Sequence, residues 1–490
     1  MPKTAETKPD AAPVKQAALV QQAAPQAASV PEDISGLFGG RGSRASRIDA
    51  GKAVRQRTPR AQLATCTLVE RDPIALIEAS NTGRLPNLIP IRYGRMLANP
   101  FAFYRGSAPL MAFDLARLPH TDITVQLGGD AHLANFGLFA SPERRILFGP
   151  NDFDETLPGP FDWDVRRLAA SFAIAARERG LDTREQRAIV RRLCATFRQC
   201  MAEFSTMDTL DVWYYQFGAE NILAIADTEL ERKKEEAVIS KAKQQSSRLV
   251  LSHGTELVNG KLRIKDMPPL IYHFPLENRK EAKQFGDTVR RFFAEYRHTL
   301  PGAQRALFDR YEMVDMAVRV VGVGSVGTRC YEALFMADGK SPLFLQVKEA
   351  RASVLEEYLP ASKFSNHGER VANGQRLLQS ATDIFLGWSR MHGTGNDFYV
   401  RQLRDMKGAF DFSTFDGKDF SEYAVSCGHA LAHSMAKAGD PALICGYLGK
   451  SDAFDEAIQQ FALAYADRNE ADWSALKAAV KSGRVQAQGE

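Results

Sequence analysis

The fold of this chain is decided by the stretch Gly128-Gly129-Asp130-Ala131-His132-Leu133-Ala134-Asn135-Phe136-Gly137. It follows an alternating apolar run at 123–127, which predicts a strand. A second acidic stretch, Asn151-Asp152-Phe153-Asp154-Glu155, comes after a hairpin-like gap. Carboxylate and carboxamide oxygens are ligands that suit Mg²⁺, and substrate phosphates can complete its shell. These two stretches therefore predict a site for phosphate chemistry.

A second phosphate-binding pattern lies far along the chain. A strand is expected directly before Gly322-Val323-Gly324-Ser325-Val326-Gly327, another over 328–336, a hairpin at Asp338-Gly339, and a third strand over 343–348 that ends near Lys348. A glycine-rich hairpin followed by a strand lysine is how protein kinases contact ATP phosphates. The dinucleotide-binding use of this glycine spacing would need a parallel βαβ unit. An ordinary hairpin with a surface lysine would give the same pattern, so the loop alone leaves both interpretations open.

The acidic stretches have the residue spacing of a catalytic loop. Asp130 and Asn135 match D-x-x-x-x-N, in which the Asp accepts the proton of a substrate hydroxyl and the Asn binds Mg²⁺. Asp152 would then be the principal Mg²⁺ ligand. Each of these residues could instead cap a turn. Their occurrence with the glycine loop and Lys348 in one chain favours the functional interpretation.

Two further residues are placed in the catalytic set. His132 is expected to order the loop without transferring a proton. Arg105 follows the aromatic residues Phe101, Phe103 and Tyr104 and can fork onto a phosphate or a carboxylate. The alternative for Arg105 is an ion pair with a structural carboxylate, and the sequence leaves that choice open.

The length of the chain allows several lobes, and its composition does not indicate a particular class of binding partner. The chain has 490 residues and a formal net charge of +4, which is no strong indication of nucleic acid binding. The six cysteines are scattered without a C-x-x-C and are expected to be free thiols in a reducing compartment. No apolar run approaches the length of a membrane span, so a cytoplasmic protein is expected.

The order of the segments predicts four regions. Residues 1–55 form an N-terminal arm, disordered to about residue 40 and basic over residues 41–60, where a solvated, partly ordered segment is expected. Residues 56–310 form a helical lobe with the catalytic loop and metal motif, and include a hairpin at Asn259-Gly260. Residues 311–410 form a small β-lobe that binds the nucleotide. Residues 411–490 add helices that complete the large lobe.

The motifs carry two resemblances. The segment 129–135 resembles the G-D-x-H-x-x-N loop of aminoglycoside and choline phosphotransferases, which belong to the kinase-like superfamily. Residues 151–154 look like their short Asp-Phe metal motif, and Asp164 looks like the Asp that opens the next helix. After about residue 50 the chain is also similar to a bacterial family of uncharacterised proteins, catalogued as a domain of unknown function. Its hallmarks here are Phe103-Tyr104-Arg105-Gly106, 129–137, 151–163, 322–331, 345–350, Gly374-Gln375-Arg376 and 398–407.

The kinase-like resemblance implies a two-lobed α+β fold that is circularly permuted. The catalytic loop and the metal Asp come first in this chain, and the glycine loop and Lys348 come later, whereas kinases have the opposite order. Permutation is tolerable where the original termini lie close together at the surface. In this arrangement Lys348 needs a helix carboxylate, for which Glu369 is the first choice and Glu356 the second. The hinge would lie at 402–405, which adds Gln402 to the nucleotide site.

The sequence thus predicts a phosphotransferase that uses ATP and Mg²⁺ and acts on a hydroxyl of an unidentified small molecule or protein. Nucleotide-binding residues would be Gly322, Gly324, Ser325, Gly327, Lys348, Glu369 and Gln402. Transfer of AMP by the same fold, and a nucleotide-binding module without catalysis, are the alternatives. A metallophosphoesterase, suggested by Asp130-x-His132, would need further short ligand motifs downstream, and none is found in the sequence.

Overall fold

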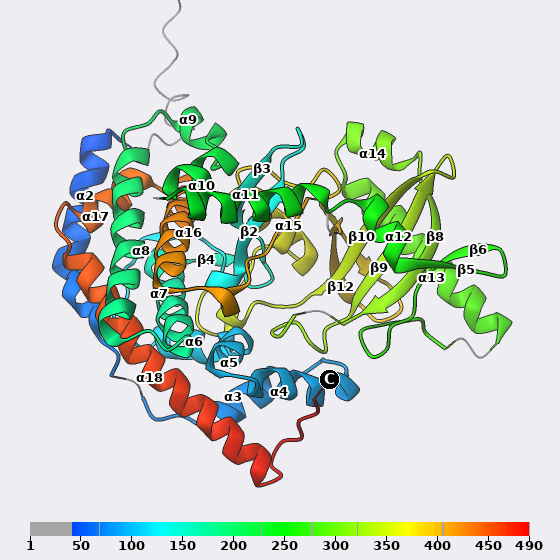
Figure 1. Cartoon of the computed structure of the whole chain (residues 1–490), viewed down its shortest axis with the longest axis horizontal. Coiled ribbons are helices and arrows are strands. Elements are labelled where there is room, and N and C mark those ends of the chain that lie inside the picture. The colour runs from blue at the N-terminus through cyan, green and yellow to red at the C-terminus, as the bar shows by residue number, and fades with distance from the viewer. Residues whose placement is uncertain are drawn as a thin grey trace, which may run out of the picture. The chain divides into compact units, whose positions relative to one another are not determined.

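The computed structural model describes residues 42–67, 69–226, 228–275, 278–320, 322–403 and 406–489. The disorder expected up to about residue 40 lies outside this part, as do residues 404–405 of the expected hinge. From Arg44 onward the chain forms one structural unit. This unit combines helices with antiparallel sheets, so the α+β class is confirmed (Figure 1).

The strands expected over 328–336 and 343–348 are both present, each within two residues of its expected ends. The described strands are β1 (Thr124–Leu127), β2 (Phe136–Ala140), β3 (Ile146–Pro150), β4 (Leu157–Pro160), β5 (Thr255–Val258), β6 (Lys261–Ile264), β7 (Ile271–Tyr272), β8 (Glu312–Arg319), β9 (Cys330–Ala337), β10 (Ser341–Ala350), β11 (Gly387–Met391) and β12 (Asn396–Gln402). The described α-helices are α2 (Arg44–Arg57), α3 (Pro73–Ala79), α4 (Ile89–Leu97), α5 (Pro100–Gly106), α6 (Ala108–Leu115), α7 (Phe161–Glu178), α8 (Thr183–Phe204), α9 (Thr209–Tyr214), α10 (Ala219–Ile225), α11 (Glu229–Gln244), α12 (Ser247–Gly254), α13 (Arg279–Thr299), α14 (Gly302–Phe308), α15 (His367–Leu378), α16 (Gly417–Ala438), α17 (Pro441–Leu448) and α18 (Ala453–Lys481).

The largest sheet has the strand order β11-β12-β10-β9-β8-β7, and its neighbouring strands are antiparallel. Asp338 and Gly339 form the turn between β9 and β10, both with positive φ (51° and 65°), as their sequence predicts. Side chains alternate between the two faces of a strand. Leu345 and Val347 of β10 therefore pack into a core with α13, and Lys348 lies on the opposite face.

The helices α7, α8, α16 and α18 supply much of the main apolar core. Figure 1 shows α7, α8 and α16 side by side. Residues 161–176 of α7 are buried, so this helix runs through the centre of the core. Asp162 and Asp164 lie in its first turn, where the helix dipole favours negative charge, and Gly180 follows its end with φ 80°. The central position of α7 lets its polar side chains support the loop that follows β1.

The basic segment expected to be a solvated arm contains the helix α2, which packs along α17. The two backbones approach closely, because a Cβ atom at Gly51 would lie 2.0 Å from a backbone oxygen of α17. Arg55 donates a hydrogen bond to the carbonyl oxygen of Tyr447 at 2.8 Å, and Arg60 donates to that of Leu448 at 2.6 Å. Carbonyls at a helix C-terminus lack partners within the helix and attract cations. These arginines therefore secure a helix that is distant in sequence.

Two expectations about residue chemistry can be compared directly with the structure. All six cysteines lie in the described part of the chain, and each is a free thiol. No helix among the described residues is both long enough and apolar enough to cross a membrane. Both observations agree with what the sequence predicts.

Candidate functional site

The loop 128–135 is held between a strand pair and the first turn of α7. β1 leads into the loop and pairs with β4, and the Asp164 carboxylate accepts hydrogen bonds from the N–H groups of Gly128 (2.7 Å) and Gly129 (3.0 Å). Gly129 has φ +81°, and a Cβ atom there would lie 2.3 Å from the carbonyl oxygen of Glu155. Only glycine fits this position. Burial raises the pKa of Asp164 to about 6.

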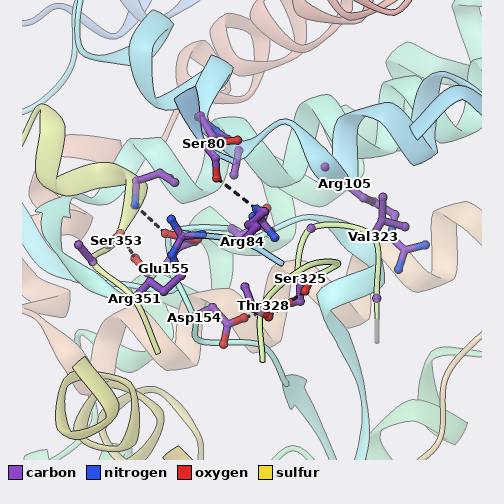
Figure 2. A pocket seen from close by; sticks show the side chains of 18 of the residues that line it. Ser80, Arg84, Arg105, Asp154, Glu155, Val323, Ser325, Thr328, Arg351 and Ser353 are labelled. Carbon is purple, nitrogen blue, oxygen red and sulfur yellow. Dashed lines mark hydrogen bonds between the residues drawn. The ribbon is translucent and has the colours of Figure 1, made fainter. Parts of the chain in front are cut away.

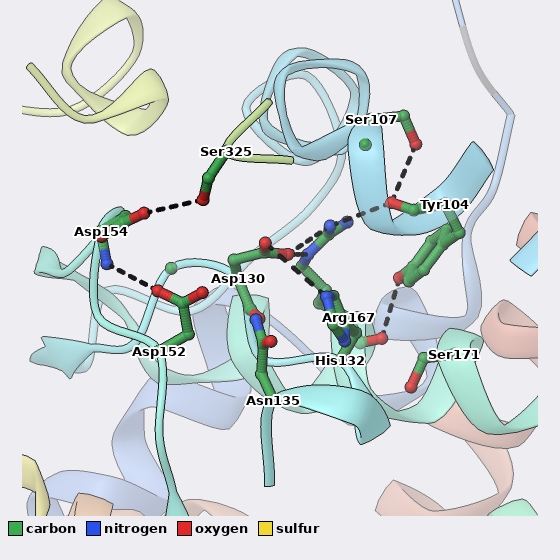
Figure 3. Close-up of polar contacts among 12 residues, drawn as sticks. Tyr104, Ser107, Asp130, His132, Asn135, Asp152, Asp154, Arg167, Ser171 and Ser325 are labelled. Carbon is green, nitrogen blue, oxygen red and sulfur yellow. Dashed lines mark hydrogen bonds and ion pairs between the residues drawn. The ribbon is translucent and has the colours of Figure 1, made fainter. Parts of the chain in front are cut away.

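Asp130 faces Arg167 of α7 in a largely buried ion pair, with Arg167 Nε 2.6 Å from Asp130 Oδ1. Burial raises the pKa of Asp130 to about 7, although the charge of Arg167 opposes this shift. His132 Nε2 lies 3.8 Å from Asp130 Oδ2, and burial lowers the pKa of His132 well below its usual value. Figure 3 shows the three side chains together. A neutral, buried imidazole fits a role in ordering the loop.

Asn135 and Asp152 are brought together by the backbone, because the N–H of Asn151 donates to the carbonyl oxygen of Asn135 at 2.9 Å. Asn135 Nδ2 donates to the carbonyl oxygen of Asp130 at 2.8 Å, which leaves its Oδ1 as a ligand oxygen. Burial opposes ionisation of Asp152, but the charge of Lys348 and other nearby cations outweigh it and lower the pKa. One carboxylate and one amide oxygen fit Mg²⁺, whose other positions water and phosphate fill.

The protein ligands of such a site would be few. Within the described residues, no group of three or more His, Cys, Asp and Glu side chains could hold a metal ion. A site that depends on Asn135 and Asp152 would therefore need oxygen atoms from a bound substrate. The Asp130–His132 pair gains no support as part of a metallophosphoesterase centre.

Lys348 pairs with the metal motif, and not with either glutamate expected from the sequence. Its ammonium group forms an ion pair with Asp154 and lies 3.8 Å from Asp152 Oδ1. Burial acts against the charge of Lys348, but the two aspartates outweigh it and raise its pKa well above the usual value. Among the described residues, no ion pair joins Lys348 to Glu369 or Glu356.

The orientation of α15 explains why Glu369 is not the partner. Arg370 of this helix donates to the carbonyl oxygen of Asp154 at 2.8 Å and to that of Thr156 at 2.6 Å. Gly374 packs so closely that a Cβ atom there would lie 2.3 Å from Thr156 Cγ2. Successive side chains on a helix point about 100° apart. The face that carries Arg370 and Gly374 is thus turned to the metal motif, and Glu369 is turned away from it.

The glycine-rich loop 322–327 lies between the stretch 151–155 and α5. The Ser325 hydroxyl donates to Asp154 Oδ2 at 3.3 Å. Two of the glycines in this loop have positive φ (68° and 89°), a conformation that L side chains rarely adopt. A Cβ atom at Gly324 would lie 3.1 Å from the carbonyl oxygen of Arg105. The loop therefore approaches the metal motif on one side and α5 on the other.

A cavity of about 540 Å³ joins most of the expected site residues (Figure 2). Those that line it are Arg105, Asp130, His132, Asn135, Asp152, Gly322, Gly324 and Ser325. Lys348 is buried and does not line the cavity, but its ammonium group lies close to Asp152 and Asp154, which do. Gln402 lines a separate cavity of about 160 Å³, and its N–H donates to Asp383. Gly327 and Glu369 line neither cavity.

The sequence patterns left several residues of this site without a role. Asp154 belongs to the metal motif but was not recognised as the partner of Lys348. Arg167 lies three residues after Asp164 in α7, a spacing that places both side chains on one helix face. That spacing was the available signal for Arg167. Arg84 and Arg351 line the cavity from loops, and their sequence context shows no pattern that could have indicated this.

The chain belongs to a family of uncharacterised proteins conserved in bacteria (DUF2252), whose sequence pattern matches residues 84–479. No curated protein and no solved structure matches the chain. The match confirms the bacterial family expected from the sequence, and it spans both acidic stretches, the glycine loop and Lys348. The description of the family names no activity, so the arguments for a function come from the site.

Proposed function

We propose that the protein is an ATP- and Mg²⁺-dependent phosphotransferase with a circularly permuted, two-lobed kinase-like arrangement. The observation that carries the proposal is the meeting, around one cavity, of the loop 128–135 and Asp152 with the glycine loop 322–327 and Lys348. A base, metal ligands, a glycine loop and a strand lysine are the parts that phosphoryl transfer uses. Residues 311–410 would cover the nucleotide, and the helical remainder would present the acceptor.

The order and contacts of the elements support a permuted arrangement. The chain runs from β8 through the glycine loop to β9 and β10, and these three strands are neighbours in the sheet. Lys348 lies on β10, the third of them, and the kinase lysine also lies on the third strand. Helix α16 comes after the sheet in sequence but supports the loop before it. Its Tyr423 hydroxyl donates to the carbonyl oxygens of Leu133 and Phe136, each at 3.0 Å.

The proposed reaction uses Asp130 as the base. The acceptor hydroxyl gives its proton to the Asp130 carboxylate while its oxygen bonds to the γ-phosphorus, and the bond to the bridging oxygen of ADP breaks. Asn135 and Asp152 would hold Mg²⁺, which neutralises phosphate charge when bound. Lys348 would exchange part of its contact with Asp154 for the nucleotide phosphates. Positioning and charge neutralisation would supply most of the rate enhancement.

A nucleotide-binding module without catalysis is the second candidate, and the Asp130–Arg167 ion pair favours it. A carboxylate that already accepts hydrogen bonds from a buried guanidinium has less of its charge available for a substrate proton. AMP transfer by the same site is the other alternative. It differs from phosphoryl transfer in the mass added to the acceptor.

The test is purified protein with ATP and Mg²⁺, followed by mass spectrometry of the protein and of candidate acceptors. Addition of a phosphate is expected, whereas addition of AMP would identify nucleotidyl transfer. Mg²⁺-dependent nucleotide binding, measured by calorimetry, should weaken at least about tenfold in Asp152→Asn, a loss of about 1.4 kcal/mol. Asp452→Asn, which changes a surface aspartate paired with Arg191, should bind as wild type does. Absence of Mg²⁺-dependent binding in the wild type would refute the proposal.

The rate of the proposed reaction is expected to rise with pH through about 7. Burial raises the pKa of Asp130 to about 7, so the base is protonated and inactive below that pH and ionised above it. The pH dependence of kcat/KM reports the ionisation of the free enzyme. Ionisation of the nucleotide could also change the rate over this pH range. Its effect is measured separately, as the pH dependence of the affinity for a non-hydrolysable Mg²⁺–ATP analogue. A profile that is flat across pH 7 would contradict the role of Asp130 as base.

A further inference from the structure

Four arginines that line the cavity have no carboxylate partner in the part of the chain that the structure describes, and one of them, Arg92, is fully buried and bound to Ser80, Asn81 and the carbonyl oxygen of Gly106. Of the other three, Arg84 follows α3, Arg105 lies in α5, and Arg351 follows β10. In the described part of the chain none of them forms an ion pair with a carboxylate. Figure 2 shows Arg84 between Arg351 and Arg105 in that view. We call these three residues the arginine wall.

Neutral groups hold the arginine wall in position. Arg84 Nε donates to the carbonyl oxygen of Ser80 at 3.1 Å, and its Nη1 donates to that of Val326 at 2.6 Å. Arg351 donates to the carbonyl oxygen of Thr82. Among the described residues, no hydrogen-bond acceptor contacts the buried Nε of Arg105. Carbonyl oxygens orient a guanidinium, but they leave its positive charge uncompensated.

The carboxylates of the same cavity are already engaged by other groups. Glu155 accepts a hydrogen bond from the N–H of Val354 at 2.7 Å. Glu349 forms an ion pair with Arg329 at 3.1 Å. Within the described ranges, these acidic residues lower the local electrostatic potential but form no ion pair with a member of the arginine wall.

The arrangement carries an electrostatic cost when the cavity holds only water. Burial, followed by the charge of Arg351, lowers the pKa of Arg84 to about 10, and burial lowers the pKa of Arg105. Arg351 therefore repels Arg84, and the nearby carboxylates offset only part of the shift. An anion placed between them would relieve the repulsion, and a planar guanidinium fork matches the oxygens of a phosphate or a carboxylate.

We propose that the arginine wall binds an oxyanion, a phosphate or a carboxylate, on the second substrate. The acceptor would then be a small anionic molecule with a hydroxyl group, and this inference rests on the proposed phosphotransferase function. The volume of about 540 Å³ is that of a small-molecule site. Arg105 lies near the proposed catalytic residues, because attraction to the charges of Asp130 and Asp152 raises the pKa of Arg105 against the effect of burial. An acceptor anchored by its oxyanion would present its hydroxyl toward Asp130.

The experiment measures binding of inorganic phosphate, and separately of citrate, to the full chain by calorimetry. Each titration is done with the protein alone and with protein saturated with Mg²⁺ and a non-hydrolysable ATP analogue. The wild type should bind the anion in both states. Arg351→Gln and Arg84→Gln should each weaken anion binding at least about tenfold, and Arg351→Gln should leave nucleotide affinity unchanged. Arg290→Gln is the matched control, because Arg290 is a surface arginine with 78% of its side chain exposed.

The outcomes separate this inference from the proposed function. Arg84 also supports two backbone carbonyls, so Arg351→Gln keeps the test decisive if Arg84→Gln does not fold. Anion binding that is unchanged in Arg351→Gln would overturn the inference. Anion binding that disappears when the nucleotide analogue is bound would also overturn it, because the arginines would then serve the nucleotide. Failure of the analogue to bind would refute the proposed function, whereas phosphate binding that is still sensitive to Arg351→Gln would support the anion site.

Discussion

Replacing Asp130 with asparagine is expected to lower Mg²⁺–ATP turnover by about 10²–10⁴-fold, the usual contribution of a general base. Asparagine keeps the shape of the side chain and a hydrogen-bond acceptor for Arg167, but it cannot take a proton. Nucleotide affinity should change little, because Asp130 contacts the acceptor and not the phosphates in the proposed reaction. Turnover is measured as phosphate release or as the mass change of the acceptor, and affinity by calorimetry.

The control for this variant must account for stability. Asp130→Asn leaves the buried Arg167 without a charged partner, which can cost about 3–5 kcal/mol. Asp114→Asn provides a comparison, because Asp114 pairs with the buried Arg71 at 2.6 Å and lies outside the cavity lining. That variant should lose stability but keep turnover. Equal loss of turnover in both variants would mean that Asp130 acts through the fold and not as a base.

Replacing Lys348 with methionine is expected to destabilise the protein by about 3–5 kcal/mol and to weaken nucleotide binding. The ammonium group is buried against Asp154 and Asp152, and its removal takes away the cation that contacts both carboxylates. The nucleotide phosphates would lose the same charge. Chemical denaturation measures the free energy of unfolding, and calorimetry with the Mg²⁺–ATP analogue measures affinity.

A second substitution separates these two effects. Lys348→Met combined with Asp154→Asn removes one charge from each partner of the ion pair and should recover part of the lost stability, without recovering nucleotide affinity. Lys437→Met is the matched control, because Lys437 is a partly buried lysine that donates to the carbonyl oxygens of Arg376 and Gln379 outside the cavity. If Lys348→Met binds the analogue as tightly as the wild type, Lys348 is not a phosphate ligand.

Local patterns in the sequence were sufficient for the elements that carry the candidate site. The Asp338-Gly339 turn and the strand with Lys348 lie where they were predicted, and the helix that the resemblance places at Asp164 begins at Phe161. Each depends on conformational preferences of a few neighbouring residues, such as positive φ at a turn or alternation along a strand. The spacing within the loop 128–135 likewise placed Asp130 and Asn135 close together.

The sequence by itself therefore determined the α+β class, the bacterial family, and which short stretches carry acidic, glycine-rich and lysine residues. Only the tertiary structure decided how these stretches pair. It joins Lys348 to Asp154 instead of Glu369, joins Asp130 to Arg167, directs Gln402 into another cavity, and assembles the arginine wall from three distant segments. The physical reason is that partner choice depends on which face each packed element turns inward and on the cost of burying charge, and both arise from contacts between residues far apart in the chain.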